Sequence, residues 1–214
     1  MSHRFLISLK KWPLATQKAL SILNEASRYG ETRIVDFQFG PPSGGKLPFR
    51  LFIDGRRALL CELSDTAPSS LCKLREWMER CLVMDQEGVL HPELLTLDLR
   101  GLVLSMVLIH VGWDEVRSRA KPISFLVVIR SDMETPSVCC FCDTLDTITG
   151  LYQAILVCLR QYRSRFDSAE YWYDAKRFDR LNPVSTTERM LREIRSSKIE
   201  KVAIYQKSHI LKRF

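Results

Sequence analysis

Three of the chain's seven cysteines fall within four positions, in the segment SVCCFCD at residues 137–143. Clustered cysteines can bind metal, exchange electrons or form a disulfide. Structural zinc sites carry paired Cys-x(2–4)-Cys knuckles, whereas Cys139 and Cys140 are adjacent and no second knuckle follows. In a strand, Val138, Cys140 and Cys142 share one face. Because free cysteine behaves as a small buried hydrophobe, we expect Cys140 and Cys142 to be buried, reduced and free of metal.

Other residue types suited to catalysis are scattered along the chain. The chain contains four histidines, which are His3, His91, His110 and His209. No two of them have the i, i+3 or i, i+4 spacing of a helical metal pair. Glu62 and Asp98 lie in apolar segments where strand alternation points them toward solvent. The sequence contains no GxSxG, Walker A, GxGxxG, HExxH or EF-hand motif. It therefore predicts no catalytic residue, metal or cofactor, and it leaves enzymatic activity uncertain while favouring a protein without one.

The net charge of +7 is concentrated at the C-terminal end. Residues 1–159 hold 18 Lys and Arg and 18 Asp and Glu, whereas residues 160–214 hold 14 and 7. This asymmetry is typical either of solvated helix faces or of a surface that binds an anionic partner. Aromatic residues at 171–173 are interleaved with the cations, as in proteins that bind nucleic acids. The candidate contacts for an anion or nucleic acid are Lys176, Arg177, Arg180, Arg189, Arg192, Arg195 and Lys198.

The periodicity of apolar residues predicts an α+β fold. Period-2 alternation and turn residues predict strands in these segments: 32–39, 48–63 with a hairpin turn at Asp54-Gly55, 94–113 with a bend at 98–102, 122–129 and 137–143. Amphipathic stripes predict helices at 13–30, 68–82 and 147–166, with further helices at 168–181 and 182–197 and an edge strand at 201–206. We expect antiparallel sheets with the helices packed on one face.

The same order of predicted elements, β-β-β-α, recurs along the chain as two meander-like units. Aligning Phe49 with Phe125 and Cys61 with Cys140 suggests an internal duplication of about 32–84 and 94–166. The alternative is that the two segments are unrelated and share only the order of strands and helices that is common in α+β proteins. We predict one domain over residues 1–214, with a basic helical extension over 167–214.

Composition limits the location and the class of function. Apolar residues make up 46% of the chain and charged residues 27%, as in ordinary globular proteins. The longest apolar stretch, 101–112, is too short to span a bilayer, and the first residues lack the features of a signal peptide. The odd number of cysteines argues against a secreted disulfide framework. We therefore expect a cytoplasmic, non-enzymatic accessory protein of the immunity or adaptor kind, which binds a protein partner and no membrane. Nucleic-acid binding by the basic C-terminal helices is the alternative.

Overall fold

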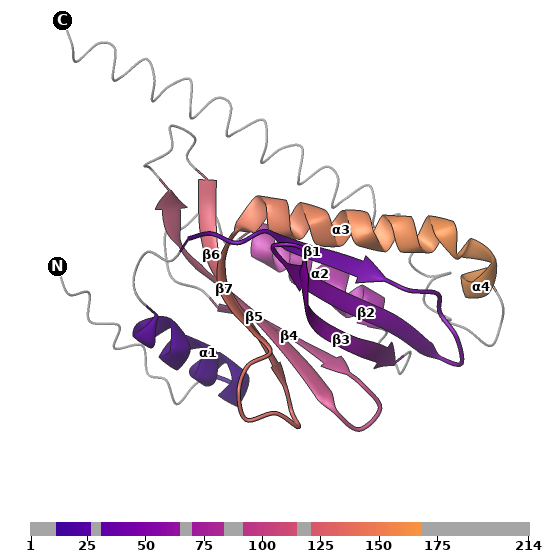
Figure 1. Cartoon of the computed structure of the whole chain (residues 1–214), viewed down its shortest axis with the longest axis horizontal. Coiled ribbons are helices and arrows are strands. Elements are labelled where there is room, and N and C mark those ends of the chain that lie inside the picture. The colour runs from indigo at the N-terminus through magenta and orange to yellow at the C-terminus, as the bar shows by residue number, and fades with distance from the viewer. Residues whose placement is uncertain (1–11, 27–30, 65–69, 84–91, 115–120, 168–214) are drawn as a thin grey trace, which may run out of the picture.

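The computed structural model describes residues 12–26, 31–64, 70–83, 92–114 and 121–167. Its elements, in chain order, are α1 (Leu14–Glu25), β1 (Val35–Phe39), β2 (Lys46–Ile53), β3 (Arg56–Ser64), α2 (Ser70–Val83), β4 (Pro92–Asp98), β5 (Val103–Asp114), β6 (Lys121–Arg130), β7 (Val138–Asp143), α3 (Thr144–Gln161) and α4 (Arg163–Asp167). They form two antiparallel sheets, β1-β2-β3 and β4-β5-β6-β7 (Figure 1). The predicted α+β class is confirmed, whereas the helices and strand expected beyond residue 167 lie outside the described residues.

The three-stranded sheet follows the alternation of its sequence. Buried and exposed residues alternate strictly along β1, so one face of the sheet packs and the other meets solvent. The predicted turn between β2 and β3 is confirmed: Asp54 and Gly55 have φ of 50° and 74°. Positive φ at both central residues is what a two-residue type I′ turn requires, and Asp and Gly tolerate it.

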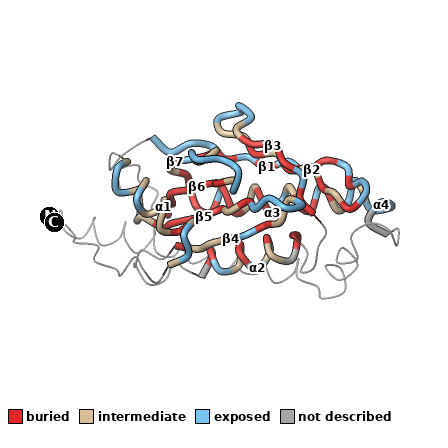
Figure 2. Tube along the Cα trace, turned by 90° about the horizontal axis from the view of Figure 1, so that it is seen from below, coloured by how far each residue is buried: buried red, intermediate tan, exposed pale blue. Residues whose placement is uncertain are grey.

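The main core lies between the sheets and the helices α2 and α3. The predicted stripe of α2 is entirely buried: Leu71, Leu74, Trp77, Met78, Cys81 and Leu82. The stripe of α3 is buried at Ile148, Leu151, Tyr152 and Ile155. Figure 2 shows buried residues along the strands and on the helix sides that face them, with exposed residues at the turns. Burial of these apolar faces supplies the main driving force for docking the helices.

Helix α1 departs from the expectation that all helices pack on one face. Ala19 of α1 is fully buried against the opposite face of the four-stranded sheet, where it joins Val107, Ile109, Phe125 and Val127. The reason is that β5 and β6 are apolar on both faces, so each face needs cover. The expectation of three strands in the second unit is also wrong, because β4 to β7 form a four-stranded meander before α3.

The hairpins β2-β3 and β6-β7 differ in register. Phe49 pairs with Cys61, whereas Cys140 pairs with Leu126 and not with Phe125. A difference of one residue reverses the face on which a side chain lies. Phe49 accordingly joins the main core, while Phe125 joins the cluster under α1. The internal duplication stays a prediction.

Helix α3 begins earlier and ends earlier than its sequence predicted. The Asp143 side chain caps it by accepting a hydrogen bond from the Asp146 backbone N–H at 3.0 Å, so the helix starts at Thr144 directly after β7. It ends at Gln161, and the short helix α4 follows. The two sheets meet near the start of α3, where the Arg33 N–H donates to the Phe141 carbonyl at 2.8 Å.

Replacing Gly40 with alanine is expected to destabilise the fold. A Cβ at this position would lie 2.9 Å from the Pro48 Cβ, and the Gly40 N–H donates to the Pro48 carbonyl at 2.8 Å. Because relieving that overlap must shift the backbone, we expect urea denaturation of Gly40→Ala to show a loss of about 1–3 kcal/mol. Gly150→Ala is the matched control, since its Cβ would meet only the Val35 carbonyl at 3.8 Å. Its free energy of unfolding should stay equal or rise by up to about 1 kcal/mol. Equal losses in both variants would contradict this packing.

Candidate interaction site

Two of the three clustered cysteines are part of the core. Along β7 the residues alternate as predicted, with Cys140 and Cys142 buried and Cys139 exposed. All three are free thiols in the structure. Burial raises the pKa of the Cys142 thiol to about 12, so it stays protonated and is a poor nucleophile. Among the described residues, no three His, Cys, Asp or Glu side chains lie close enough together to hold a metal ion.

A buried polar network joins these strands to the start of α3. The hydroxyls of Ser124 and Thr144 lie 2.7 Å apart, and Thr144 also donates to the Pro122 carbonyl at 2.9 Å. The Cys142 thiol lies 3.6 Å from the Ser124 carbonyl, and the buried His110 is the cross-strand partner of Ser124. The hydroxyls and the thiol have partners inside the core. The arrangement therefore stabilises the junction of β6, β7 and α3, and its burial shields it from a substrate.

The remaining acidic candidates are not brought together with His110. Glu62 is exposed on β3 and pairs with Lys46, with 2.6 Å between the Glu62 Oε2 and the Lys46 Nζ. Asp98 ends β4, where its Oδ1 accepts from the Arg100 N–H at 2.8 Å. His110 is buried in β5. These three side chains therefore form no shared cleft. The seven predicted basic contacts, from Lys176 to Lys198, lie outside the described residues and stay a prediction.

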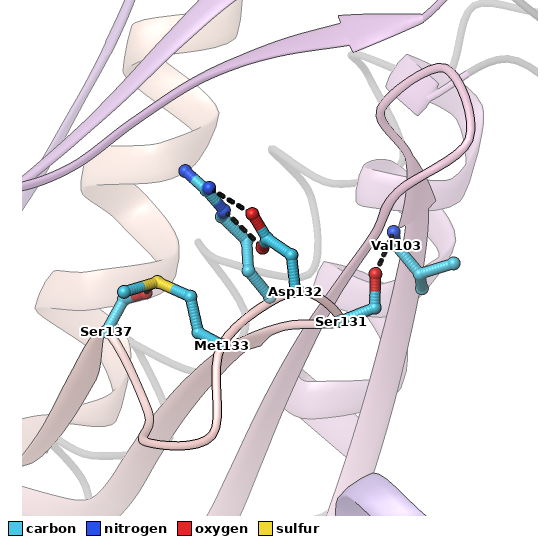
Figure 3. A network of polar contacts seen from close by, with 6 residues as sticks. Val103, Ser131, Asp132, Met133 and Ser137 are labelled. Carbon is cyan, nitrogen blue, oxygen red and sulfur yellow. Dashed lines mark hydrogen bonds and ion pairs between the residues drawn. The ribbon is translucent and has the colours of Figure 1, made fainter.

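Three turns far apart in the sequence are joined by hydrogen bonds. We call them the turn rim: residues 40–46, 98–103 and 131–137. Arg100 Nη2 donates to the Gly44 carbonyl at 2.6 Å. The Val103 N–H donates to the Ser131 Oγ at 2.9 Å, as Figure 3 shows. The Ser131 N–H donates to the Val103 carbonyl, also at 2.9 Å. These bonds position loops on a rigid scaffold, which is where binding residues concentrate in proteins.

Helical elements hold both ends of the turn rim. The Lys18 ammonium of α1 donates to the Glu134 carbonyl in the third turn. The Arg165 guanidinium of α4 donates to the Pro42 carbonyl in the first turn at 3.4 Å. The turn rim is thereby a continuous band from α1 to α4, fixed by contacts at each junction.

The turn rim exposes three large apolar side chains. Leu102 is 36% exposed, Val103 39% and Met133 44%. The Met133 side chain lies beside Ser137 of the same turn (Figure 3), with 3.6 Å between the Ser137 hydroxyl and the Met133 Sδ. Isolated exposed apolar residues are common, but these three lie on two turns that are bonded to each other. The turn rim therefore exposes apolar side chains on turns whose backbones are hydrogen-bonded to each other.

Polar contacts set the shape of the two turns. Arg100 has φ of 59°, a left-handed conformation that costs a residue with a Cβ about 1–2 kcal/mol, and Asp98 supports it by accepting from its N–H. In the other turn, Arg130 donates to both carboxylate oxygens of Asp132, at 2.9 and 2.6 Å. Hydrogen bonding from Arg130 lowers the pKa of Asp132. A strained residue held in place by its neighbours is a common feature of binding sites.

Sequence reasoning placed the turns but missed the turn rim. The bend at 98–102 and the turn before 137 were predicted, yet Arg100 and Gly44 are 56 positions apart and no periodic pattern connects them. The nearest indication in the sequence is the pair Arg100-Gly101, which predicts a tight turn but not its contact with Gly44. No family model matches the chain, and no curated protein or solved structure is significantly similar to it. No helix among the described residues is long and apolar enough to span a membrane.

Proposed function

We propose that the protein acts without catalysis, as an accessory protein of the immunity or adaptor kind that binds another protein through the turn rim. The observation that supports this is the exposure of Leu102, Val103 and Met133 on two turns that are hydrogen-bonded to each other. Turns whose backbone is already ordered lose little conformational entropy when a partner covers them. Such positions are suited to anchor a protein interface.

The placement of the reactive groups supports the same proposal. Glu62, Asp98 and His110 occupy separate places, and the Cys142 thiol is buried and protonated at neutral pH. General acid–base catalysis needs titratable groups within hydrogen-bond reach of one substrate. The described residues offer surface contacts in place of such a cleft. Nucleic-acid binding by the basic C-terminal segment is the second candidate, and its support comes from the charge distribution of the sequence.

Site-specific photo-crosslinking tests the proposal directly. A photoreactive amino acid is placed at Met133 in the full chain, and the matched control carries it at Val157, which is 58% exposed on α3. In the cells that produce the protein, we expect position 133 to crosslink to one discrete protein species and position 157 to give none. The triple variant Leu102→Ser, Val103→Thr, Met133→Ser should fold and compete poorly with the wild type for the same species.

Two results would count against protein binding at the turn rim. One is equal crosslinking from positions 133 and 157, which would indicate random encounters at the surface. The other is the absence of a protein adduct at position 133 while the chain is folded and expressed. Circular dichroism of each variant establishes that the fold is retained.

A further inference from the structure

We infer that α1 is a releasable strap. It leaves the four-stranded sheet without unfolding the rest of the described fold, and while it is docked it holds the 131–137 turn of the turn rim in place. The release of α1 is a property of the fold alone, whereas its effect on partner binding rests on the proposed function.

Helix α1, which lies wholly within the described residues, lacks the features that stabilise helix ends. Pro13 occupies its N-cap without a side-chain hydrogen bond, its first turn has no acidic residue and its last turn has no basic residue. It has 12 residues, and isolated helices shorter than about 12–15 residues are marginal in water. Helix α3 has all three features: Asp143 caps it, Asp146 lies in its first turn and Arg160 in its last. The stability of α1 therefore depends on its contacts with the sheet.

The buried surface of α1 is small. Of its 12 residues Thr16 and Ala19 are buried, whereas nine of the 18 residues of α3 are buried. Leu14 is 80% exposed, and the other large apolar residues of α1 are only partly buried: Leu20, Ile22 and Leu23. The apolar sheet face beneath α1 keeps the docked form dominant, so the released form is a minor state.

One of the two buried side chains of α1 opposes docking. Thr16 is fully buried, and its Oγ1 has no hydrogen-bond partner in the described part of the chain. A hydroxyl that loses its hydrogen bonds to water needs a partner inside the protein to offset that loss. The buried Thr144 of α3 has such partners, with the Ser124 hydroxyl at 2.7 Å and the Pro122 carbonyl at 2.9 Å. Release of α1 returns the Thr16 hydroxyl to water.

Lys18 connects α1 to the turn rim. Its ammonium donates to the Glu134 carbonyl, in the turn that also carries Met133. The start of this turn is held separately, by the bonds between Ser131 and Val103. The contact from Lys18 exists only while α1 is docked. Release of α1 therefore loosens the middle of the turn and leaves its start in place.

Amide hydrogen exchange of the full chain measures the release. We expect the amides of α1 to exchange about 100-fold faster than those of α3, through a local opening. Low concentrations of urea should barely change the α1 rate, because this opening exposes little surface, whereas α3 should follow global unfolding. Equal protection of α1 and α3, with the same dependence on urea, would overturn the inference.

One substitution at two threonines tests the cause of the release. Thr16→Val removes the unpartnered hydroxyl and keeps the branched shape, so exchange of α1 should slow about tenfold. Thr144→Val is the matched control, because it removes a hydroxyl that has partners. It should speed exchange of α3 about tenfold and leave α1 unchanged. A Thr16→Val variant whose α1 exchanges no more slowly than the wild type would contradict this cause.

A buried charge separates the strap from the rest of the fold. Ala19→Glu places a carboxylate where α1 meets the sheet, so the α1 amides should lose their protection. Protection of α3 should fall by no more than the factor that protected α1 in the wild type. Ile148→Glu, in the main core, is the matched control and should remove protection from both helices. Loss of protection throughout Ala19→Glu would show that α1 cannot leave separately.

The connection to the turn rim is tested at Lys18. Lys18→Met keeps the apolar stem and removes the donor, so amides of the 131–137 turn should exchange about threefold faster. With the photoreactive residue at Met133, its adduct yield should also fall about threefold relative to the control Lys73→Met on α2. Unchanged exchange in the turn would overturn the clamping role of α1. A wild-type chain that gives no adduct would refute the proposed function, while the exchange results still decide whether α1 is a strap.

Discussion

Replacing Trp77 with alanine is expected to lower the free energy of unfolding by about 3–5 kcal/mol. Trp77 is fully buried in α2, and its indole N–H donates to the Glu93 carbonyl of β4 at 3.0 Å. The substitution leaves a large cavity and removes a donor from that carbonyl. Because whole domains are stable by only about 5–15 kcal/mol, the variant should be close to unfolding at 37 °C.

Urea denaturation followed by circular dichroism measures this effect. Trp77→Phe keeps most of the apolar volume and loses the hydrogen bond, so we expect it to cost about 1–2 kcal/mol. Val157→Ala changes an exposed position on α3 and should stay within about 0.5 kcal/mol of the wild type. A loss of less than about 1 kcal/mol for Trp77→Ala would contradict the docking of α2 on β4.

Helix α2 also covers the edge strand β4 of the four-stranded sheet. Trp77 and Arg80 of α2 both donate to carbonyls of β4, at Glu93 and Leu94. An uncovered edge strand offers unpaired backbone groups to other chains, and a helix that covers it prevents this. The edge strand β3 uses another device, a bulge opposite the step from Leu51 to Phe52. Bulges bend a strand and disfavour further pairing.

The sequence predicted the local elements because local periodicity determines them. Alternation located the strands, the stripe containing Trp77 located α2, and Asp54-Gly55 located the hairpin. The position of α1 could not be predicted, because a stripe shows that a helix packs but not on which sheet face. The start of α3 was predicted three residues too late. Asp143 was assigned only to the end of the strand, whereas its side chain also caps the helix that follows directly.

The turn rim marks the limit of such prediction. Its defining contacts join Arg100 with Gly44 and Val103 with Ser131, across separate elements. Contacts between turns produce no repeating pattern in the sequence, because they depend on how the two sheets pack relative to each other. The cysteines were predictable for the opposite reason. Alternation along β7 was enough to place Cys140 and Cys142 on one face, and the apolar character of free cysteine favoured burial of that face, whereas Cys139 on the other face is exposed.

The buried thiols should make the fold sensitive to alkaline pH. Burial raises the pKa of Cys142 to about 12, and it raises the pKa of Cys81 well above its usual value. Both side chains are almost fully buried. A thiol in the unfolded chain loses its proton near pH 8.5, so above that pH the unfolded state binds fewer protons than the folded one. The stability that each neutral thiol contributes is therefore complete below about pH 8.5 and is lost progressively as pH rises toward 12.

Removing the Cys142 thiol isolates its share of this effect. Between pH 9 and pH 10.5, a fully buried thiol should lower the free energy of unfolding by up to about 2 kcal/mol. Lysine and tyrosine also titrate in this range, but their contribution cancels in the difference between wild type and Cys142→Ala.

Urea denaturation in reductant should show that the variant is less stable at pH 7 and loses about 2 kcal/mol less than the wild type on going to pH 10.5. The matched variant Cys139→Ala removes an exposed thiol from the same strand and should follow the wild-type pH dependence closely. Parallel curves for wild type and Cys142→Ala would show that the Cys142 thiol ionises equally in both states, and they would contradict its burial.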